Sequence, residues 1–430
     1  MHLKRAFCFC LCLLITVLCW AQRLSAVEKN IIKNIDRNLP QTIALLEQLV
    51  NINSGTLNVE GVKKTGLILG KEFEKIGFTS EWITLPDSLK RAGHLAVMKK
   101  GNKGKKLLLL GHLDTVFEPD MPPNPYKKLN DSTATGQGVL DMKGGNVIIL
   151  AALQALHEAG LLKNASITAY FTGDEEKAGT PTSVSRADFI QRAQQHDIAL
   201  GFETAQSLET VATGRRGSSG WQLHVTGVQA HSAGVFNNNY GAIYEAGRIL
   251  NSFREQLSNE KYLTLNPGII AGGSDVQYDS TTVRADVQGK TNIIAPRVVV
   301  QGDLRFLTEE QKEAAREKMR MIATTNNLPA TSARISFVDG IPGMEPTEGN
   351  NKLVQLLNKV SVDMGLGETK AGDPGSRGAG DISYIAKYLD CLDGLGPMGS
   401  GSHAPGEIIN LKELPLLIHR AAIFIYRLTR

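Results

Sequence analysis

Cysteine is scarce over most of this sequence. Four of the five cysteines fall within the first 20 residues, at positions 8, 10, 12 and 19, and only Cys391 follows. A single cysteine can form neither an internal disulfide nor a cysteine-rich metal site, so both are excluded beyond residue 26. We interpret Cys391, which lies near the end of an apolar stretch, as a buried core residue rather than a nucleophile.

The chain also lacks a strong charge of either sign. Its formal net charge is +4 at pH 7, and three positive charges, Lys4, Arg5 and Arg23, lie in residues 1–26, where no acidic residue occurs. Without that segment the chain would be close to neutral, and it has no clustered basic stripe. We therefore expect no nucleic-acid partner and no attraction to a membrane surface.

Long apolar runs are rare, and the clearest one lies at the start. Two basic residues precede a run from Ala6 to Trp20 that is apolar except for Thr16, and small residues follow at positions 21 and 25–26. This order is typical of a secretory signal peptide of residues 1–26, cleaved after one of the small residues. An uncleaved anchor is disfavoured by the short run, and a lipoprotein signal at Cys19 is disfavoured by the bulky residue after it. We expect a secreted or periplasmic protein without a stable membrane anchor.

The body of the chain divides into two kinds of sequence. Its 430 residues, 42% hydrophobic and 21% charged, suffice for two or three domains. Residues 27–213 alternate strand-like and helix-like segments, with buried strands predicted at 107–110, 166–171 and 198–202 and a helix at 146–161. That alternation predicts an α/β domain with a mixed or parallel sheet covered by helices.

After residues 214–217 the pattern changes. Alternating strands are predicted at 219–226, 282–287, 298–306 and 333–338, with helices at 240–257 and 308–323. This order predicts a small α+β sandwich over residues 214–344, inserted in the larger domain. Residues 345–430 then return to the first domain, beginning with a helix at 351–364.

Five short motifs carry residue types that bind metal ions. They are residues 111–115 (GHLDT), 138–145 (GVLDMKGG), 174–176 (DEE), 201–204 (GFET) and 399–405 (GSGSHAP). The first four lie at or just past strand-like or turn-bounded segments, and ligands gather at the carboxyl ends of strands in open α/β sheets. Each motif alone is weak, whereas all five in this order are specific.

Two histidines and three acids satisfy a pair of metal ions that share a bridging carboxylate. The adjacent Glu175 and Glu176 cannot point the same way from an extended segment, so one can ligate while the other stays free. Asp114, two residues after His112, is placed to accept the second ring proton of that histidine.

At this point the chain resembles the dinuclear-zinc metallopeptidases that include glutamate carboxypeptidase of the carboxypeptidase G type, succinyl-diaminopimelate desuccinylase and aminoacylase. The resemblance runs from about Ile43 to the C-terminus. It implies a zinc-peptidase-like catalytic domain, and it makes residues 214–344 a lid that mediates homodimerisation. It also implies two Zn²⁺ per chain, with Co²⁺ or Mn²⁺ as alternatives because nitrogen and oxygen ligands accept several divalent ions.

The resemblance assigns roles to residues of the five motifs. Asp141 would bridge the metals. His112 and Glu203 would complete one zinc site, and Glu176 and His403 the other. Glu175 would be the general base.

Three further residues match positions in the lid of the resembling proteins. His231, within residues 227–234 (GVQAHSAG), matches a histidine that reaches the partner subunit's site and stabilises an oxyanion. Asn292 and Arg305 match the residues that hold a substrate carboxylate, although the spacing from Asn292 to Pro296 is one residue longer than usual.

A glutamate at position 203 is associated in the resembling proteins with carboxypeptidase or deacylase activity. We therefore expect metal-activated water to cleave a C-terminal amino acid, with glutamate among the candidates, from small peptides or N-acyl amino acids. An N-acyl-amino-acid deacylase and a catalytically silent binding homologue are the alternatives. The sequence does not specify the preferred amino acid or acyl group, the native metal or the signal cleavage site.

Overall fold

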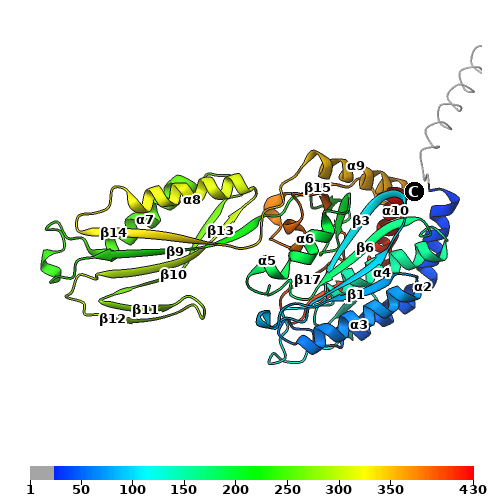
Figure 1. Ribbon diagram of the computed structural model, residues 1–430, viewed down its shortest axis with the longest axis horizontal. Coiled ribbons are helices and arrows are strands. Elements are labelled where there is room, and N and C mark those ends of the chain that lie inside the picture. Colours follow the sequence, from blue (N-terminus) through cyan, green and yellow to red (C-terminus); the bar gives the residue numbers. More distant parts are fainter. Residues whose placement is uncertain (1–23) are drawn as a thin grey trace, which may run out of the picture. The chain divides into compact units, whose positions relative to one another are not determined.

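The computed structural model describes residues 24–430, which form two compact units (Figure 1). The first unit contains the described residues up to Thr213 together with Thr347–Gly372 and Ile385–Arg430, and the second contains Gly214–Pro346 and Asp373–Tyr384. Most of the predicted signal peptide, residues 1–23, lies outside the described residues. From residue 24 onward, no helix is both long and apolar enough to cross a membrane.

A six-stranded mixed sheet forms the centre of the first unit. Its strands, in spatial order, are β1 (Thr79–Ile83), β2 (His94–Lys99), β6 (Ala165–Thr172), β3 (Lys103–His112), β7 (Ile198–Gly201) and β16 (Asp390–Leu392). The strands from β6 to β16 are parallel, and β1 and β2 add an antiparallel edge. The three strands predicted for this domain all lie in this sheet, so the predicted mixed α/β architecture is confirmed.

Helices cover the sheet because its strands are apolar on both faces. The longer ones are α2 (Ala26–Val50), α3 (Val59–Lys75), α4 (Lys143–Glu158), α9 (Glu348–Asp363) and α10 (Leu414–Thr429), and α5 (Thr182–Ser185) and α6 (Ala187–Ala193) are short. The helices α4 and α10 pack on β3, and α2 packs on both of them, while α3 packs on β1 and β2. Nearly all of α4 is buried, which explains its continuous apolar sequence.

Two small sheets tie distant segments to this core. One contains β17 (Gly399–Ser400), β18 (Ile408–Asn410), β5 (Thr133–Thr135) and β4 (Lys127–Lys128), and the other pairs β15 (Lys370–Ala371) with β8 (Thr210–Val211). The loop between β17 and β18 contains His403. Because β18 pairs with β5, this loop is fixed close to the turn that precedes α4.

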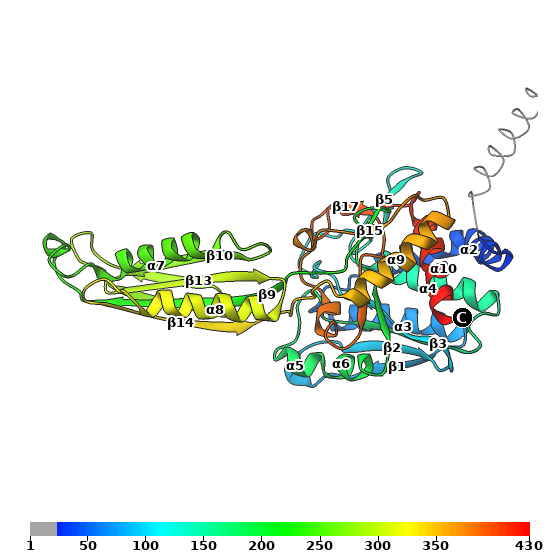
Figure 2. The ribbon, with the colours of Figure 1, turned by 90° about the horizontal axis from the view of Figure 1, so that it is seen from above.

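The second unit has three layers (Figure 1). Its antiparallel sheet, in spatial order, contains β10 (Thr264–Gly273), β13 (Arg297–Phe306), β9 (Gly217–Gly227) and β14 (Thr331–Asp339). The helices α7 (Gly241–Leu257) and α8 (Glu309–Thr324) lie along one face (Figure 2), and the hairpin of β11 (Asp275–Asp279) and β12 (Arg284–Gln288) lies on the other. Alternate residues of β9, among them Trp221 and Leu223, point into the core under the helices.

The second unit differs from the sequence prediction in two places. The strand β10 was not predicted, because Pro267 and three glycines interrupt its pattern, and a hairpin replaces the single strand expected at 282–287. Residues 373–384 were expected in the first domain, but they pack with the second unit. The buried Arg215 explains this, since its guanidinium donates to the carbonyl oxygens of Gly378 and Ala379 at 2.7 and 2.9 Å.

Candidate metal centre

The predicted metal ligands of the first unit come together at one edge of its sheet. His112 ends β3, while residues 174–176 and Glu203 lie two or more residues past the parallel neighbours β6 and β7. Parallel strands place their carboxyl ends at the same edge, which is why segments so far apart in sequence meet here. Asp141 adds a side chain from the turn before α4, and His403 adds one from the loop before β18.

Asp141 lies at the centre of this cluster. One carboxylate oxygen, Oδ1, is 3.2 Å from Nε2 of His112, and the other, Oδ2, is 3.1 Å from Nε2 of His403. Glu203 Oε1 lies 3.8 Å from the same nitrogen of His112, and Glu176 Oε2 lies 3.4 Å from that of His403. Two sets of three ligand atoms, each within 4.8 Å of one another, therefore share Asp141.

The electrostatics of the cluster fit divalent cations. Burial, together with the nearby carboxylates of Asp141 and Asp114, raises the pKa of Glu176 to about 9. Its Oε1 atom is buried without a hydrogen-bond partner. Burial opposes ionisation of Asp141, yet His112 and His403 hold its pKa below the usual value. The cluster gathers four carboxylates around two histidines and leaves one buried oxygen unpartnered, and two metal ions bound by these nitrogen and oxygen atoms would balance its negative charge.

Asp114 lies behind the cluster and holds two parts of it. The backbone oxygen of Asp114 is 3.0 Å from Nδ1 of His112, closer than its Oδ1 atom at 3.5 Å. Its carboxylate accepts hydrogen bonds from the backbone amides of Glu175 and Glu176, at 3.0 and 3.1 Å, and from the hydroxyl of Thr56 at 2.6 Å. The backbone oxygen of Asp114, rather than its carboxylate, is therefore the nearer partner of the His112 ring proton. The Asp114 carboxylate instead holds the backbone of the two glutamates.

Glu175 faces the metal ligands. One of its carboxylate oxygens lies within 4.8 Å of ligand atoms of His112 and Glu176. The adjacent Asp174 points away into the core, where its carboxylate pairs with the buried Arg186 and accepts from the amide of Gly179 at 2.7 Å. The loop that contains the two glutamates is therefore held on both sides.

Several supporting residues were not identified from the sequence. Asn146 donates from Nδ2 to the backbone oxygen of His112 at 2.6 Å. Glu407 is fully buried and accepts hydrogen bonds from the backbone amides of Leu140 and Asp141. Their partners are backbone atoms far away in the sequence, so no spacing rule reveals them. The only sequence signal for Glu407 is its place four residues after His403.

Two of the three predicted lid residues lie together in the second unit. The exposed His231 follows β9 and pairs with Ile293, and the amide of Ser232 donates to the backbone oxygen of Asn292 at 2.9 Å. Nδ1 of His231 accepts from the amide of Ala233 at 3.2 Å, so its ring proton is on Nε2, which is available as a donor.

Arg305 is separated from that pair. It lies at the far end of β13, and at about 3.3 Å per residue the strand places it roughly 26 Å from Arg297, which begins the strand just after the Asn292 loop. Its Nε donates to Oδ2 of Asp303 at 2.6 Å. The structure therefore groups His231 with Asn292 but not with Arg305.

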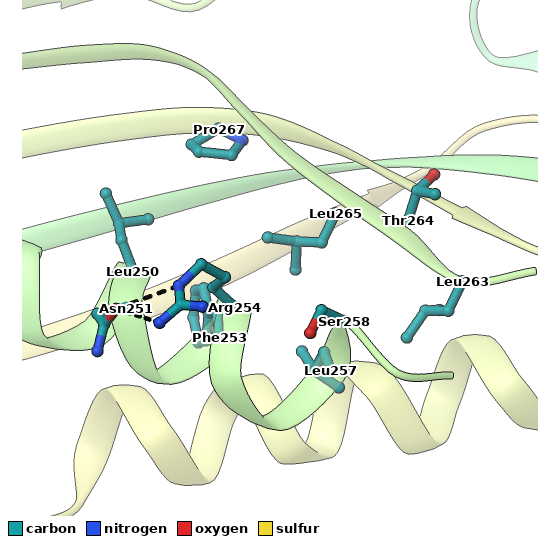
Figure 3. Close-up of a pocket in the computed structure, with 10 residues that line it drawn as sticks. All are labelled: Leu250, Asn251, Phe253, Arg254, Leu257, Ser258, Leu263, Thr264, Leu265 and Pro267. Carbon is teal, nitrogen blue, oxygen red and sulfur yellow. Dashed lines mark hydrogen bonds between the residues drawn. The ribbon is translucent and has the colours of Figure 1, made fainter. Parts of the chain in front are cut away.

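An apolar groove of about 540 Å³ lies in the second unit, between α7 and β10 (Figure 3). No predicted site residue lines it. Arg254, one of its lining residues, donates hydrogen bonds from Nε and Nη2 to Oδ1 of Asn251 on the same helix. The groove is lined by Leu250, Asn251, Phe253, Arg254, Leu257, Ser258, Leu263, Thr264, Leu265 and Pro267.

A mixed α/β sheet with two histidine–carboxylate groups sharing one aspartate defines a class, the hydrolases with a dinuclear metal centre. The sequence profile described as Peptidase family M20/M25/M40 matches residues 108–427, so the chain belongs to this family. The family is metal-dependent and typically dinuclear, and the chain is a hydrolase that acts on peptide or amide bonds. The resemblance drawn from the motifs is confirmed.

Among curated proteins, the chain is 29% identical over 392 residues to carboxypeptidase G2 from Pseudomonas sp. (strain RS-16), an alignment that covers 89% of this chain and 88% of the relative. It is 25% identical over 386 residues to succinyl-diaminopimelate desuccinylase from Polynucleobacter necessarius, covering 86% and 94% of the two chains.

Solved structures show the same fold at lower identity. The aminopeptidase PepT of Bacillus cereus superposes with a TM-score of 0.75 and 18% identity, over 91% of this chain and 99% of the other. An M20 family metallo-carboxypeptidase of Sulfolobus solfataricus gives a TM-score of 0.63 and 16% identity, over 90% and 98%.

Proposed function

We propose that the protein is an exported two-zinc metallocarboxypeptidase, which releases a C-terminal amino acid from small peptides or N-acyl amino acids. The observation that carries this proposal is the position of Asp141, whose two carboxylate oxygens face two separate histidines, with Glu175 beside them. The similarity to carboxypeptidase G2 supports the carboxypeptidase reaction, with glutamate among the candidate products.

The ligand set is His112, Asp141, Glu176, Glu203 and His403, and when bound, zinc would lower the pKa of a bound water and polarise the substrate carbonyl. Glu175 would act as the general base, taking a proton from the attacking water and returning it to the leaving amine. Asp114 orients this base through the Glu175 amide. The position of Glu175, beside the ligand atoms of His112 and Glu176, suits a base that must reach both water and amine.

The lid residues recognise the charged and reacting ends of the substrate. His231 donates its Nε2 proton to the oxyanion of the partner subunit's substrate, where a preorganised donor stabilises the transition state by a few kcal/mol. Asn292 holds the substrate carboxylate beside it. Arg305 is the proposed charge-assisted anchor of that carboxylate, and to act it must exchange its present partner, Asp303.

We also propose that the protein is a homodimer, assembled through the α7 and β10 edge of the second unit. The strand β10 has one free edge in the described sheet. Exposed apolar side chains cluster there, with Ile243 and Tyr244 on α7 at 54% and 53% exposure and Ile270 on β10 at 59%. The apolar groove between α7 and β10 lies on the same two elements (Figure 3). A second copy of the chain would cover it and extend the sheet.

An N-acyl-amino-acid deacylase is the second candidate, favoured by the 25% identity to succinyl-diaminopimelate desuccinylase. Both activities use the same metal centre, so only the substrate separates them. The test is release of free amino acid from a panel of C-terminal-glutamate peptides and N-acyl amino acids, with added zinc and with chelator. We expect chelator-sensitive release, and the best substrate decides between the two. A zinc-loaded dimer that hydrolyses nothing in the panel would contradict both and favour a silent binding protein.

A further inference from the structure

Glu407, a buried glutamate outside the proposed ligand set, contacts the backbone that carries the proposed ligand Asp141. Glu407 is 0% exposed, and its Oε1 accepts hydrogen bonds from the amides of Leu140 and Asp141 at 2.6 and 2.7 Å. Its other oxygen, Oε2, is buried without a hydrogen-bond partner. A carboxylate that is fully buried and half-satisfied opposes folding. The two amide hydrogen bonds offset part of this cost.

Those two amides belong to the turn that presents the shared ligand. Asp141 lies in the turn between Gly138 and α4, and this turn is otherwise closed by the amide of Lys143, which donates to the Gly138 oxygen at 2.8 Å. The Nζ atom of Lys143 points elsewhere, to the oxygen of Ile52 at 2.8 Å. Glu407 is therefore the side chain that fixes the backbone immediately before the Asp141 carboxylate.

Glu407 also belongs to the loop of a second ligand. It follows His403 by four residues, and its amide donates to the oxygen of Ala404 at 3.2 Å. Its backbone oxygen accepts from the hydroxyl of Thr135 at 2.6 Å, which fastens the end of the loop to β5. His403 itself is 58% exposed and has a left-handed backbone with φ of 65°. A loop with so exposed a ligand depends on such an anchor to hold its position.

We propose that Glu407 is a positioning residue of the metal centre, which joins the Asp141 turn to the His403 loop through its two amide hydrogen bonds. These two ligands, with Glu176, form one of the two candidate metal positions. The other position shares only Asp141 with them. Loss of the bridge should therefore weaken metal binding at the His403 position much more than at the His112 position. The inference rests on the proposed two-metal function.

The experiment measures zinc affinity of the metal-free protein by competition with a chelating dye, before any activity assay. Glu407→Asp keeps the charge but is one methylene too short to reach both amides, so we expect one of the two zinc sites to weaken 10- to 100-fold. Glu407→Gln loses the charge but keeps an acceptor oxygen at the same reach. We expect it to bind both zinc ions within about threefold of the wild type, as a rescue by the matched acceptor.

A matched control is available in the second unit. Glu245 is also 0% exposed and accepts from the side chain of Asn327 and the amide of Leu328, at 2.6 and 2.9 Å. Its Oε1 also pairs with Nη2 of Arg248 at 2.6 Å, so Glu245→Asp disturbs a buried, ion-paired carboxylate, and we expect thermal stability to fall while both zinc affinities stay unchanged.

Three results would overturn the role of Glu407 alone: unchanged zinc affinities in Glu407→Asp, an equal loss in Glu407→Gln, or an equal loss in Glu245→Asp. The first would show that the bridge is not needed. The second would show that charge rather than reach matters, and the third that any buried disturbance has this effect. A wild-type chain that binds fewer than two zinc ions would instead overturn the proposed function, and this role with it.

Discussion

Glu175 is the proposed general base, the role that would separate a hydrolase from a protein that only binds metal. Its carboxylate lies beside the ligand atoms of His112 and Glu176, and Asp114 holds its amide. The neighbouring Glu176 has the buried, unpartnered oxygen that a metal would satisfy. Adjacent residues of the same type thus have different environments, and this difference can be tested by replacing each in turn.

We predict that Glu175→Gln binds two zinc ions as the wild type does, while kcat falls about 10²- to 10⁴-fold, the usual contribution of a general base. Metal analysis and steady-state kinetics on the best panel substrate measure both quantities. Glu176→Gln is the matched control, because loss of a ligand should lower metal content as well as rate. Full metal content with an unchanged rate in Glu175→Gln would refute the assignment.

At the scale of elements, the first helix of the described chain gives information on processing. Ser25 caps α2, with its hydroxyl accepting from the amide of Glu28 at 3.2 Å, while the Glu28 carboxylate accepts from the Ser25 amide at 2.7 Å. Such a capping box stabilises a helix by about 1 kcal/mol. Cleavage after Ala26 would remove it, whereas cleavage after Ala21 would keep it.

We therefore predict that removal of the proposed signal peptide leaves a chain that begins at residue 22. N-terminal sequencing of the processed chain measures this directly, and a start at residue 27 would show that the cap is dispensable. In a chain that begins at residue 22, Ser25→Ala should lower the free energy of unfolding by about 1 kcal/mol, measured by urea denaturation.

The contact between α10 and α2 predicts a pH dependence of stability. His419 is mostly buried, and its Nε2 lies 2.8 Å from Oδ1 of Asp36. Burial lowers the pKa of His419 below its usual 6.5, although Asp36 opposes the shift. The folded protein therefore binds this proton less readily than the unfolded chain. The stability that the neutral ring contributes is present above pH 6.5 and is lost as the pH falls through the lower, folded-state value.

We predict that His419→Gln, which keeps a neutral polar group, reduces the decrease in the unfolding temperature between pH 7 and pH 5. Differential scanning calorimetry of both proteins across that range gives the comparison. Identical pH profiles would mean that the His419 pKa is the same in the folded and unfolded states.

At the scale of the whole molecule, the proposed reaction needs two copies of the chain. We predict that Ile270→Lys, on the free edge of β10, converts a dimer into a monomer, because it buries a charge in the proposed apolar interface. Analytical ultracentrifugation measures the change. Since His231 would act in the partner's site, kcat should fall when the dimer dissociates, while each chain still binds two zinc ions.

Val338→Lys is the control for that prediction, since Val338 is 70% exposed on β14, the opposite edge strand of the same sheet. It should leave both mass and rate unchanged. A wild-type chain that sediments as a monomer with full activity would contradict both the dimer and the role of His231.

The sequence by itself determined the mixed α/β class and the family, and it predicted an inserted sandwich over residues 214–344. Strand and helix periodicities follow from which residues are buried locally. The five motifs are short segments that can be recognised, in their order along the chain, from a single sequence. Prediction failed where local patterns are weak: β10, broken by a proline and glycines, the β11–β12 hairpin, and residues 373–384, which pack with the second unit through the buried Arg215.

Tertiary structure alone decided how the site is held. The two-residue spacing from His112 predicted that Asp114 lies near the histidine. Only the fold shows that its carboxylate accepts hydrogen bonds from the amides of Glu175 and Glu176. Only the fold likewise placed Glu407 on the Asp141 turn and separated Arg305 from Asn292 along a ten-residue strand. The physical reason is that these contacts join side chains to backbone atoms distant in sequence. Nearly every residue has the same backbone donor and acceptor, so the sequence does not indicate which of them a given side chain will contact.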